Sequence, residues 1–269
     1  MKKTIYLFAS VILLLSCKKE SSNPTTTTTT TTTNSTDTTK KPTVSNIDFS
    51  AVGTPIGKFG NGVTDIEGNK YKTVILGKQE WMAENLKTTK YNDGSIIPLT
   101  IDTIQWVNKL IGAYCNYANK DSIGNIYGKL YNWYTVYTKK VCPTGWHVPD
   151  DNEWSSLISY LGGEKIDVGI LRENGTNHWT APDNYTTTSS NRALFTALPG
   201  GLRFGDIKTE IPIKYSSLYL EYHGYWWSST ENQDNYYTKA SYHTIDNNNY
   251  YRKDIFLKKG GMSIRCIKD

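Results

Sequence analysis

The sequence contains few of the residues that most often carry enzyme chemistry. Its 269 residues include only four cysteines and four histidines. The histidines are scattered, at His147, His178, His223 and His243, and no two of them have the spacing of a metal-binding pair. Gly-x-Ser-x-Gly and phosphate-loop patterns are absent as well. Sequence motifs therefore predict no catalytic residue, no metal ligand and no cofactor, although carboxylates far apart in a chain can still meet in a folded site.

The chain also lacks an apolar run long enough to cross a bilayer. The apolar segment Ile5–Leu15 has eleven residues, whereas a transmembrane helix needs about 20. It follows Lys2-Lys3, which is typical of a secretory signal peptide. Leu14-Leu15-Ser16-Cys17 resembles a bacterial lipobox, which implies cleavage before Cys17 and acylation, including palmitate. We therefore expect residues 1–16 to be a lipoprotein signal peptide and Cys17 to be the lipidation site.

This N-terminus predicts a location in the bacterial cell envelope, with the membrane contacted through the N-terminal lipid. The outer membrane is the expected membrane, and the periplasmic or surface side is left open. Residues 17–59 contain the lipidated cysteine and a tether with nine consecutive threonines, Thr25–Thr33. A segment so poor in apolar residues is expected to be disordered. The net charge of +5 is diffuse and forms no basic helix, so nucleic acid is not an expected partner.

Residues 60–269 are expected to form one domain with a mostly antiparallel sheet and few helices. The chain has 20 tyrosines and 8 tryptophans, and aromatic residues favour strands. Apolar alternation bounded by Gly- or Asn-rich turns predicts strands at Tyr71–Leu76, Gly224–Ser228, Tyr236–Ile245, Tyr250–Leu257 and Met262–Ile267. Leu130–Tyr137 is a candidate short helix. The expected fold class is α+β.

The segment Cys142–Trp154 gives the clearest local prediction. Asp150 and Glu153 have the spacing of a capping box at a helix start. Apolar residues follow at helical spacing from Trp154 to Leu161 and stop at Gly162-Gly163, a typical helix end. Trp146-His147-Val148 before it is typical of a strand. We interpret His147 as a packed strand residue, because it lacks the spacing of a metal ligand.

A series of motifs resembles the Fibrobacter succinogenes major paralogous (FISUMP) domain family. They run in family order across residues 63–269 and include Val63–Tyr71, Gln79–Leu86, Tyr91–Gly94, Tyr127–Tyr134, Cys142–Trp154, Phe195–Gly201, Gly224–Glu231 and Ser263–Cys266. The resemblance implies no activity. The motif tryptophans are expected in the core, and these are Trp81, Trp133, Trp146, Trp154, Trp226 and Trp227.

The order of these motifs is similar to the C-type-lectin-like fold of formylglycine-generating sulfatase modifiers. Trp146–Trp154 corresponds to their motif ending in Glu-Trp, and Gly261–Cys266 corresponds to their late strand ending in Arg-Cys. The similarity implies a C-type-lectin-like domain. The modifiers need a further cysteine pair before the final strand, and this chain has no cysteine between Cys142 and Cys266. Their activity is therefore not carried over.

Calcium-dependent sugar binding is not supported either. Ala181-Pro182-Asp183 lacks the first carboxylate or amide of the lectin triplet. In the lectin-like fold the two ends of the domain lie side by side, which implies a disulfide bond between Cys142 and Cys266 and a free Cys115. Pairing of Cys115 with Cys142 remains the alternative. The compartment beyond the inner membrane is oxidising and permits either bond.

Surface tyrosines are the remaining candidates for a function. Tyr236, Tyr237, Tyr242, Tyr250 and Tyr251 fall in late strands with Asn-rich connections. Exposed tyrosine beside asparagine makes an adaptable recognition surface, although core or cross-strand packing is the favoured explanation of any single ring. The sequence favours a non-catalytic binding or adhesion module for a glycan or a surface protein. The alternative is an envelope enzyme that acts on polysaccharide or glycoconjugate through distant carboxylates.

Overall fold

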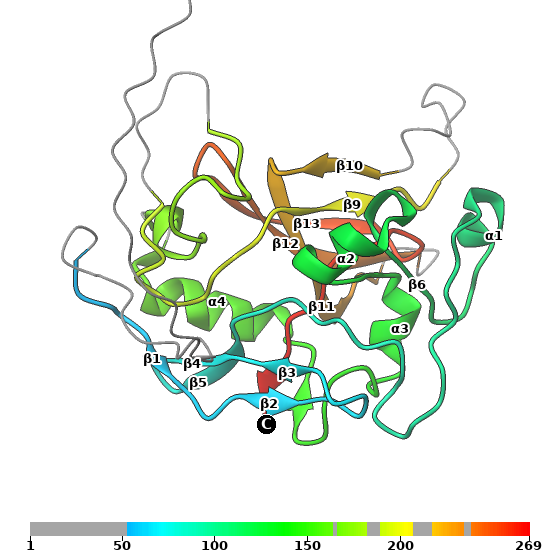
Figure 1. The fold of residues 1–269 in the computed structure, drawn as a ribbon, viewed down its shortest axis with the longest axis horizontal. Helices are drawn as coiled ribbons and strands as arrows, with labels where there is room; N and C mark the ends of the chain where they lie inside the picture. The colour runs from blue at the N-terminus through cyan, green and yellow to red at the C-terminus, as the bar shows by residue number, and fades with distance from the viewer. Residues whose placement is uncertain (1–52, 164–165, 182–188, 207–216, 234–237) are drawn as a thin grey trace, which may run out of the picture. The chain divides into compact units, whose positions relative to one another are not determined.

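The computed structural model describes residues 53–163, 166–181, 189–206, 217–233 and 238–269. The expected signal peptide, Cys17, the tether as far as residue 52, and Tyr236 and Tyr237 lie outside these residues. Within them the chain combines several antiparallel sheets with four α-helices, which confirms the expected α+β class with few helices. Figure 1 shows the arrangement.

The helices are short apart from one. They are α1 (Thr103–Val107), α2 (Asp121–Tyr127), α3 (Trp133–Tyr137) and α4 (Asp151–Tyr160), with 3-10 turns η1 (Tyr117–Asn119) and η3 (Val168–Ile170). The candidate helix Leu130–Tyr137 is only partly helical. Its first two residues form a strand, and α3 starts after Asn132, whose side chain accepts a hydrogen bond from the amide of Thr135.

Two sheets organise the domain. The first, in spatial order, contains β1 (Lys58–Phe59), β4 (Thr73–Leu76), β5 (Gln79–Met82), β14 (Ile267–Lys268) and β8 (Trp146–His147). The second contains β11 (His223–Glu231), β12 (Lys239–Asp246) and β13 (Tyr251–Leu257). Three two-stranded ribbons complete the described strands: β2 (Val63–Thr64) with β3 (Lys70–Tyr71), β6 (Tyr114–Cys115) with β7 (Leu130–Tyr131), and β9 (Gly200–Arg203) with β10 (Ser217–Leu220).

The N-terminal edge of the first sheet lies just before the expected domain start at residue 60. Lys58 and Phe59 pair with Ile75 and Val74 of β4. The amide of Ile56 also donates to a backbone carbonyl of the domain, at 2.7 Å. The folded part therefore includes residues that the composition assigned to the tether.

The C-terminal strand β14 lies between β5 and β8 and joins the two ends of the domain. Ile267 pairs with both Trp81 and His147. The expected strand Met262–Ile267 is regular only at its end. Residues 261–263 each bridge a different segment, and the following residues run through the core to β14. The segment is extended, but no single neighbouring segment pairs with it over enough residues to form a regular strand ladder.

Helix α4 matches its prediction. Asp150 accepts hydrogen bonds from the amides of Asn152 and Glu153, and the Glu153 carboxylate accepts one from the Asp150 amide, so the capping box is complete. The helix buries Trp154 against the first sheet, where its ring lies 4.8 Å from that of Trp81. All six motif tryptophans are at most 8% exposed, which confirms them as core residues.

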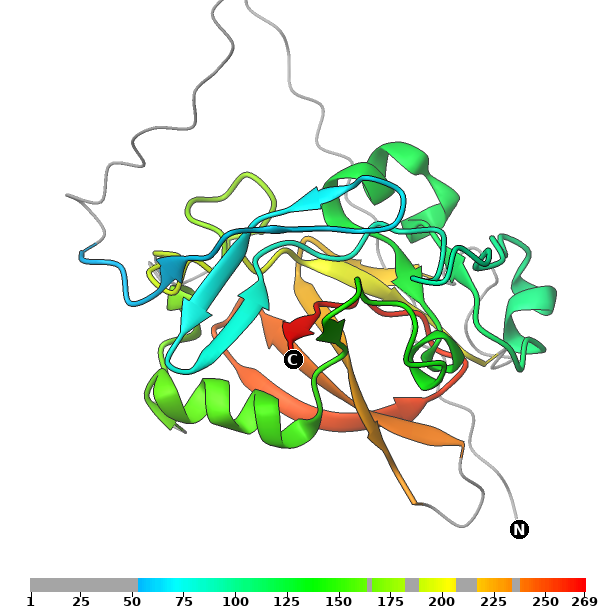
Figure 2. The same cartoon turned by 90° about the horizontal axis from the view of Figure 1, so that it is seen from below.

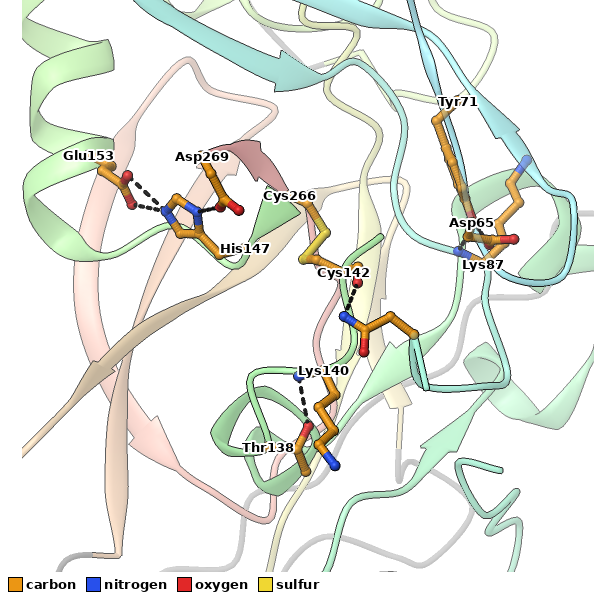
Figure 3. The surroundings of a disulfide bond; sticks show 11 residues. Asp65, Tyr71, Lys87, Thr138, Lys140, Cys142, His147, Glu153, Cys266 and Asp269 are labelled. Carbon is orange, nitrogen blue, oxygen red and sulfur yellow. Dashed lines mark hydrogen bonds and ion pairs between the residues drawn. A yellow bond between two sulfur atoms is a disulfide. The ribbon is translucent and has the colours of Figure 1, made fainter. Parts of the chain in front are cut away.

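The disulfide bond joins Cys142 to Cys266, and the alternative pairing with Cys115 is wrong. Cys115 is free and buried. Figure 3 shows the bond tying the segment before β8 to the segment that enters β14. Because the two cysteines are 124 residues apart in the sequence, the bond closes nearly the whole second half of the domain.

A fully buried arginine holds the motifs together from inside. Arg265 donates to the side-chain oxygen of Asn85 at 2.8 Å and to the carbonyls of Phe195 and Thr196. Its guanidinium also stacks 4.3 Å from the Phe195 ring and lies near Trp226. Burial lowers the pKa of Arg265 to about 9. Three motifs far apart in the sequence thus meet at one side chain.

Candidate binding site

The asparagine-rich turn between β12 and β13 is fixed by its own first residue. Asp246 accepts hydrogen bonds from the amides of Asn248 and Tyr250, at 3.0 and 2.9 Å. Asn249 has a φ of 66°, in the left-handed region that asparagine tolerates better than most residues. The local sequence Asp-Asn-Asn-Asn therefore folds as a defined turn.

A buried arginine supports this turn from below. Arg172 is 3% exposed, and it donates to the carbonyl of Asn247 at 3.1 Å and to the side-chain oxygen of Asn249 at 2.8 Å. Its guanidinium stacks 4.5 Å from the ring of Trp179. The turn is therefore held in one conformation before any ligand arrives, which reduces the entropy cost of binding.

A second turn, Tyr219–Tyr222, lies against the first. The amide of Asn247 donates to the carbonyl of Tyr222 at 2.9 Å and links the two turns. Tyr219 and Glu221 both have a φ of 67°. Such a φ is strained for a bulky residue, costs of order 1–3 kcal/mol and gathers at functional sites. Two backbone hydrogen bonds hold this strained geometry. The Glu221 amide donates to the carbonyl of Pro199 at 3.0 Å, and the Thr180 amide donates to the carbonyl of Glu221 at 2.8 Å.

The two turns border a hollow that we call the Tyr219 hollow. It has a volume of about 510 Å³, and its described lining is Thr180, Ala181, Tyr219, Tyr222, His223, Asn247 and Asn248. Tyr219 and Tyr222 are 45% and 48% exposed. Burial lowers the pKa of His223, so its imidazole is neutral at pH 7. The described lining is consequently uncharged, with aromatic rings beside amides.

A second hollow, the Tyr251 hollow, uses other residues of the same asparagine-rich turn. It measures about 520 Å³ and is lined by Ser155, Ile158, Ser159, Gly163, Ile166, Asn249, Tyr250, Tyr251 and Lys253. The first three come from α4, where Ile158 is buried and the two serines are exposed, and Lys253 comes from β13. Tyr250 is 61% exposed at its rim. The asparagine-rich turn therefore contributes to both hollows.

A buried hydrogen-bonded chain lies behind the Tyr251 hollow. The Tyr251 hydroxyl is 2.5 Å from Nδ1 of His243, and Nε2 of His243 is 3.2 Å from Asp151. Burial lowers the pKa of His243 although Asp151 opposes this, and burial raises the pKa of Tyr251. With a neutral imidazole, Tyr251 donates to Nδ1, and Nε2–H donates to Asp151. The hydroxyl thus points at the buried ring and stays protonated, so the chain fastens β13 to α4.

His147 is surrounded by two carboxylates, as Figure 3 shows. Its Nδ1 lies 2.6 Å from Asp269, and its Nε2 lies 2.9 Å from Glu153. Partial burial disfavours the charged ring, but these hydrogen bonds raise the pKa of His147 above its ordinary value. His147 is a strand residue of β8, as expected, but its side chain is not packed: it is 42% exposed and pairs with Glu153 of α4 and with Asp269, which follows β14.

The structure separates the tyrosines that the sequence singled out. Tyr242 is half-buried, with its ring 5.7 Å from Tyr225 and 6.2 Å from Phe256, which is a packing role. Tyr250 and Tyr251 both line the Tyr251 hollow. Tyr236 and Tyr237 lie outside the described residues.

Sequence reasoning missed Tyr219, Tyr222 and Arg172. The aromatic density of the segment before Gly224 is a signal that could have identified the two tyrosines. Nothing local marks Arg172, because its partner Asn249 follows 77 residues later.

Two negative findings concern the described residues only. Among them, no group of three or more His, Cys, Asp or Glu side chains is arranged to hold a metal ion. No helix in this part of the chain is long and apolar enough to cross a membrane.

Comparison with known proteins gives one match. The model of the Fibrobacter succinogenes major domain family (Fib_succ_major) matches residues 74–268, which contain both sheets apart from the edge strand β1, the disulfide bond and both hollows. No curated protein and no solved structure matches the chain. The chain belongs to the Fibrobacter succinogenes major domain family.

Proposed function

We propose that this protein is a non-catalytic module of the cell envelope that binds a neutral glycan in the Tyr219 hollow. The observation that carries the proposal is the pairing of two half-exposed tyrosine rings, Tyr219 and Tyr222, with the exposed amide of Asn248, beside the buried Asn247 whose amide donates to the carbonyl of Thr180. A tyrosine ring offers a flat apolar face to a sugar ring, and its hydroxyl hydrogen-bonds at the edge. Amide side chains both donate and accept, as sugar hydroxyls do.

Three further features support a sugar rather than an ion or an apolar ligand. The volume of about 510 Å³ falls in the usual range for small-ligand sites. The described lining carries no formal charge at neutral pH, which disfavours phosphate and carboxylate ligands. The strained φ of Tyr219, held by surrounding hydrogen bonds, indicates that the position of this ring is maintained at a cost to stability.

The proposal includes a C-type-lectin-like fold. Its support is the pairing of β14 with both β5 and β8, which brings the two ends of the domain together. The disulfide bond between Cys142 and Cys266 reinforces the same closure. Calcium is not part of the proposal, because the lectin triplet is incomplete at Ala181.

The proposal also places the domain on a lipid anchor at Cys17, in the bacterial outer membrane. Its support is the lipobox-like sequence after an eleven-residue apolar segment. Cells grown with labelled palmitate should label the native protein and leave a Cys17→Ala variant unlabelled. Equal labelling of the two would contradict the anchor.

The alternative of a polysaccharide-cleaving enzyme has less support. Neither Asp nor Glu is among the described residues that line the Tyr219 and Tyr251 hollows. The buried chain ending at Tyr251 resembles a catalytic relay in its order, but its hydroxyl points at the imidazole rather than into open space. We therefore favour binding without turnover.

A glycan array tests the proposed function. The mature chain, residues 17–269 with Cys17→Ala, would be probed at physiological and at high salt. We expect hits among neutral glycans that persist at high salt, because the described lining carries no charge to be screened. Hits confined to anionic glycans and lost in salt, or released products instead of retained ligand, would contradict the proposal.

A further inference from the structure

Residues 96–111 expose an unusual density of aliphatic side chains. Six of them are between 51% and 73% exposed, namely Ile96, Leu99, Ile101, Ile104, Leu110 and Ile111. We call this set the aliphatic face. Single exposed apolar residues are ordinary on protein surfaces, whereas large apolar patches mark interaction surfaces, and these six lie within sixteen consecutive residues. Neither hollow includes any of these residues.

Hydrogen bonds hold this segment in place, so the exposure belongs to a defined structure. The amide of Tyr114 donates to the carbonyl of Pro98 at 3.0 Å, and the amide of Thr100 donates to the carbonyl of Tyr114 at 2.9 Å. These two bonds join the start of the segment to the residues that follow it. From beneath, the buried Arg203 donates to the carbonyls of Thr100 and Ile101 at 3.0 and 2.9 Å. Each member of the aliphatic face therefore projects from a supported backbone.

Helix α1 lies in the middle of the face and has two unlike sides. Trp106 and Val107 are buried, and the Trp106 indole donates to the carbonyl of Lys259 at 2.7 Å. Ile104 points away from this contact and is 51% exposed. Figures 1 and 2, which differ by a quarter turn, both show α1 at the margin of the domain. An extended flat partner can approach α1 at this margin.

The composition of the face favours lipid over protein. Binding hot spots between proteins are rich in Trp, Tyr and Arg and poor in Leu, and residues 96–111 expose none of those three types. Aliphatic side chains instead suit the boundary between headgroups and acyl chains. Asp102 is the one acidic residue in the segment, and its carboxylate caps α1.

Lysines lie around the face. Lys109 is within the segment, Lys90 bridges Ile96 through the backbone, and Lys120 follows Asn119, which donates to the carbonyl of Ile101. None of the three forms an ion pair with a described carboxylate. Basic residues around an apolar face favour a bilayer with anionic headgroups.

We propose that the aliphatic face docks on an anionic lipid bilayer. The chain between Cys17 and the first described residue, Gly53, reaches on the order of 35 Å if flexible. Acylation of Cys17 would therefore keep the domain close to the membrane. Because β1 and α1 lie at opposite margins of the domain in Figures 1 and 2, docking of the face requires the domain to turn its α1 side toward the bilayer. The proposal does not depend on glycan binding, because the two surfaces share no described residue.

Vesicle sedimentation tests the docking without the lipid anchor. The mature chain, residues 17–269 with Cys17→Ala, is mixed with phosphatidylcholine vesicles that contain or lack phosphatidylglycerol. We expect binding to the anionic vesicles that falls but persists at high salt, and quenching of tryptophan fluorescence by brominated lipid, since Trp106 lies directly beneath the face. Ile104→Asp and Leu110→Asp together should weaken partitioning about tenfold or more, because less apolar area enters the interface.

Ile75→Asp is the control. Ile75 is 39% exposed on β4, which Figure 1 shows on the opposite side of the domain from α1. It should leave partitioning unchanged. Absence of binding by the parent chain, complete loss of binding in high salt, or equal weakening by Ile75→Asp would each overturn the proposal. Concentration-dependent dimerisation abolished by Ile104→Asp, without vesicle binding, would assign the face to a second copy of the chain and overturn it too.

Discussion

Nη1 of Arg172 lies 2.8 Å from the side-chain oxygen of Asn249, and this contact supports the turn that borders both hollows. Arg172→Ala removes both hydrogen bonds to the turn and the stacking on Trp179, so we expect the free energy of unfolding to fall by about 3 kcal/mol. Asn249→Ala removes one bond and also places alanine at a φ of 66°, so it should cost about 2 kcal/mol. Urea denaturation measures both.

Arg252→Ala is the control for that prediction. Arg252 also bonds to the turn, 3.1 Å from Asp246, but its side chain is 63% exposed. An exposed ion pair contributes at most about 1 kcal/mol. If Arg252→Ala destabilised the protein as much as Arg172→Ala, the buried arginine would not be the support of the turn.

Arg265 is expected to be among the most sensitive positions of the chain. Arg265→Lys places one ammonium where a planar guanidinium reaches Asn85 and two carbonyls at once. Acceptors left unpaired in the core cost about 1–3 kcal/mol each, so we expect a loss of about 2–4 kcal/mol, seen as a lower urea midpoint. Lys268→Ala, at an exposed side chain nearby in the sequence, should change the midpoint little. Similar effects of the two variants would contradict the structural role of Arg265.

The disulfide bond should make a large contribution to stability. Its cysteines are 124 residues apart, and constraint of an unfolded loop of that length corresponds to about 4–5 kcal/mol in the chain-entropy model. We expect the double variant Cys142→Ala, Cys266→Ala to show a much lower melting temperature than the parent. Cys115→Ala serves as the control for cysteine removal and should leave the disulfide intact in non-reducing peptide maps. A double variant as stable as the parent would show that the loop is constrained by other contacts.

His147 should make stability depend on pH in a defined direction. Its folded-state pKa is raised, so the charged ring stabilises the fold fully below its unfolded pKa of about 6.5. This contribution is lost as the pH rises through the higher folded-state pKa. The difference in unfolding free energy between the parent and His147→Gln should therefore shrink from pH 5.5 to pH 8.5. A difference that stays constant, or grows with pH, would show that the carboxylates of Asp269 and Glu153 do not favour the charged ring.

The local features were the ones that could be predicted from the sequence. The capping box and apolar spacing specify α4, because both act within one or two turns of helix. The strands β11 to β13 follow from alternation and turn residues. The disulfide pairing followed from a resemblance to a fold, since two cysteines 124 residues apart leave no local mark.

The candidate site depended on contacts that no local pattern contains. Tyr219 lines a hollow because its backbone adopts a φ of 67°, and that conformation is imposed by neighbours distant in the sequence. Arg172 supports Asn249 from 77 residues away. Tyr242 alternates as a surface strand residue would, yet it packs against Tyr225 and Phe256 on the inner side of the second sheet.

Equilibrium binding of the best neutral glycan to three tyrosine variants tests the proposed function most directly. Tyr222→Ala removes a half-exposed ring from the Tyr219 hollow, and Tyr222→Phe keeps the ring without its hydroxyl. Tyr137→Ala removes a ring that is 67% exposed on α3 and lies outside the hollow. Loss of ring contact of about 1.5–3 kcal/mol corresponds to roughly tenfold or greater weakening. We predict at least tenfold weaker binding for Tyr222→Ala, a smaller change for Tyr222→Phe and none for Tyr137→Ala. Unchanged binding by Tyr222→Ala, in a variant with the parent's melting temperature, would contradict glycan recognition in the Tyr219 hollow.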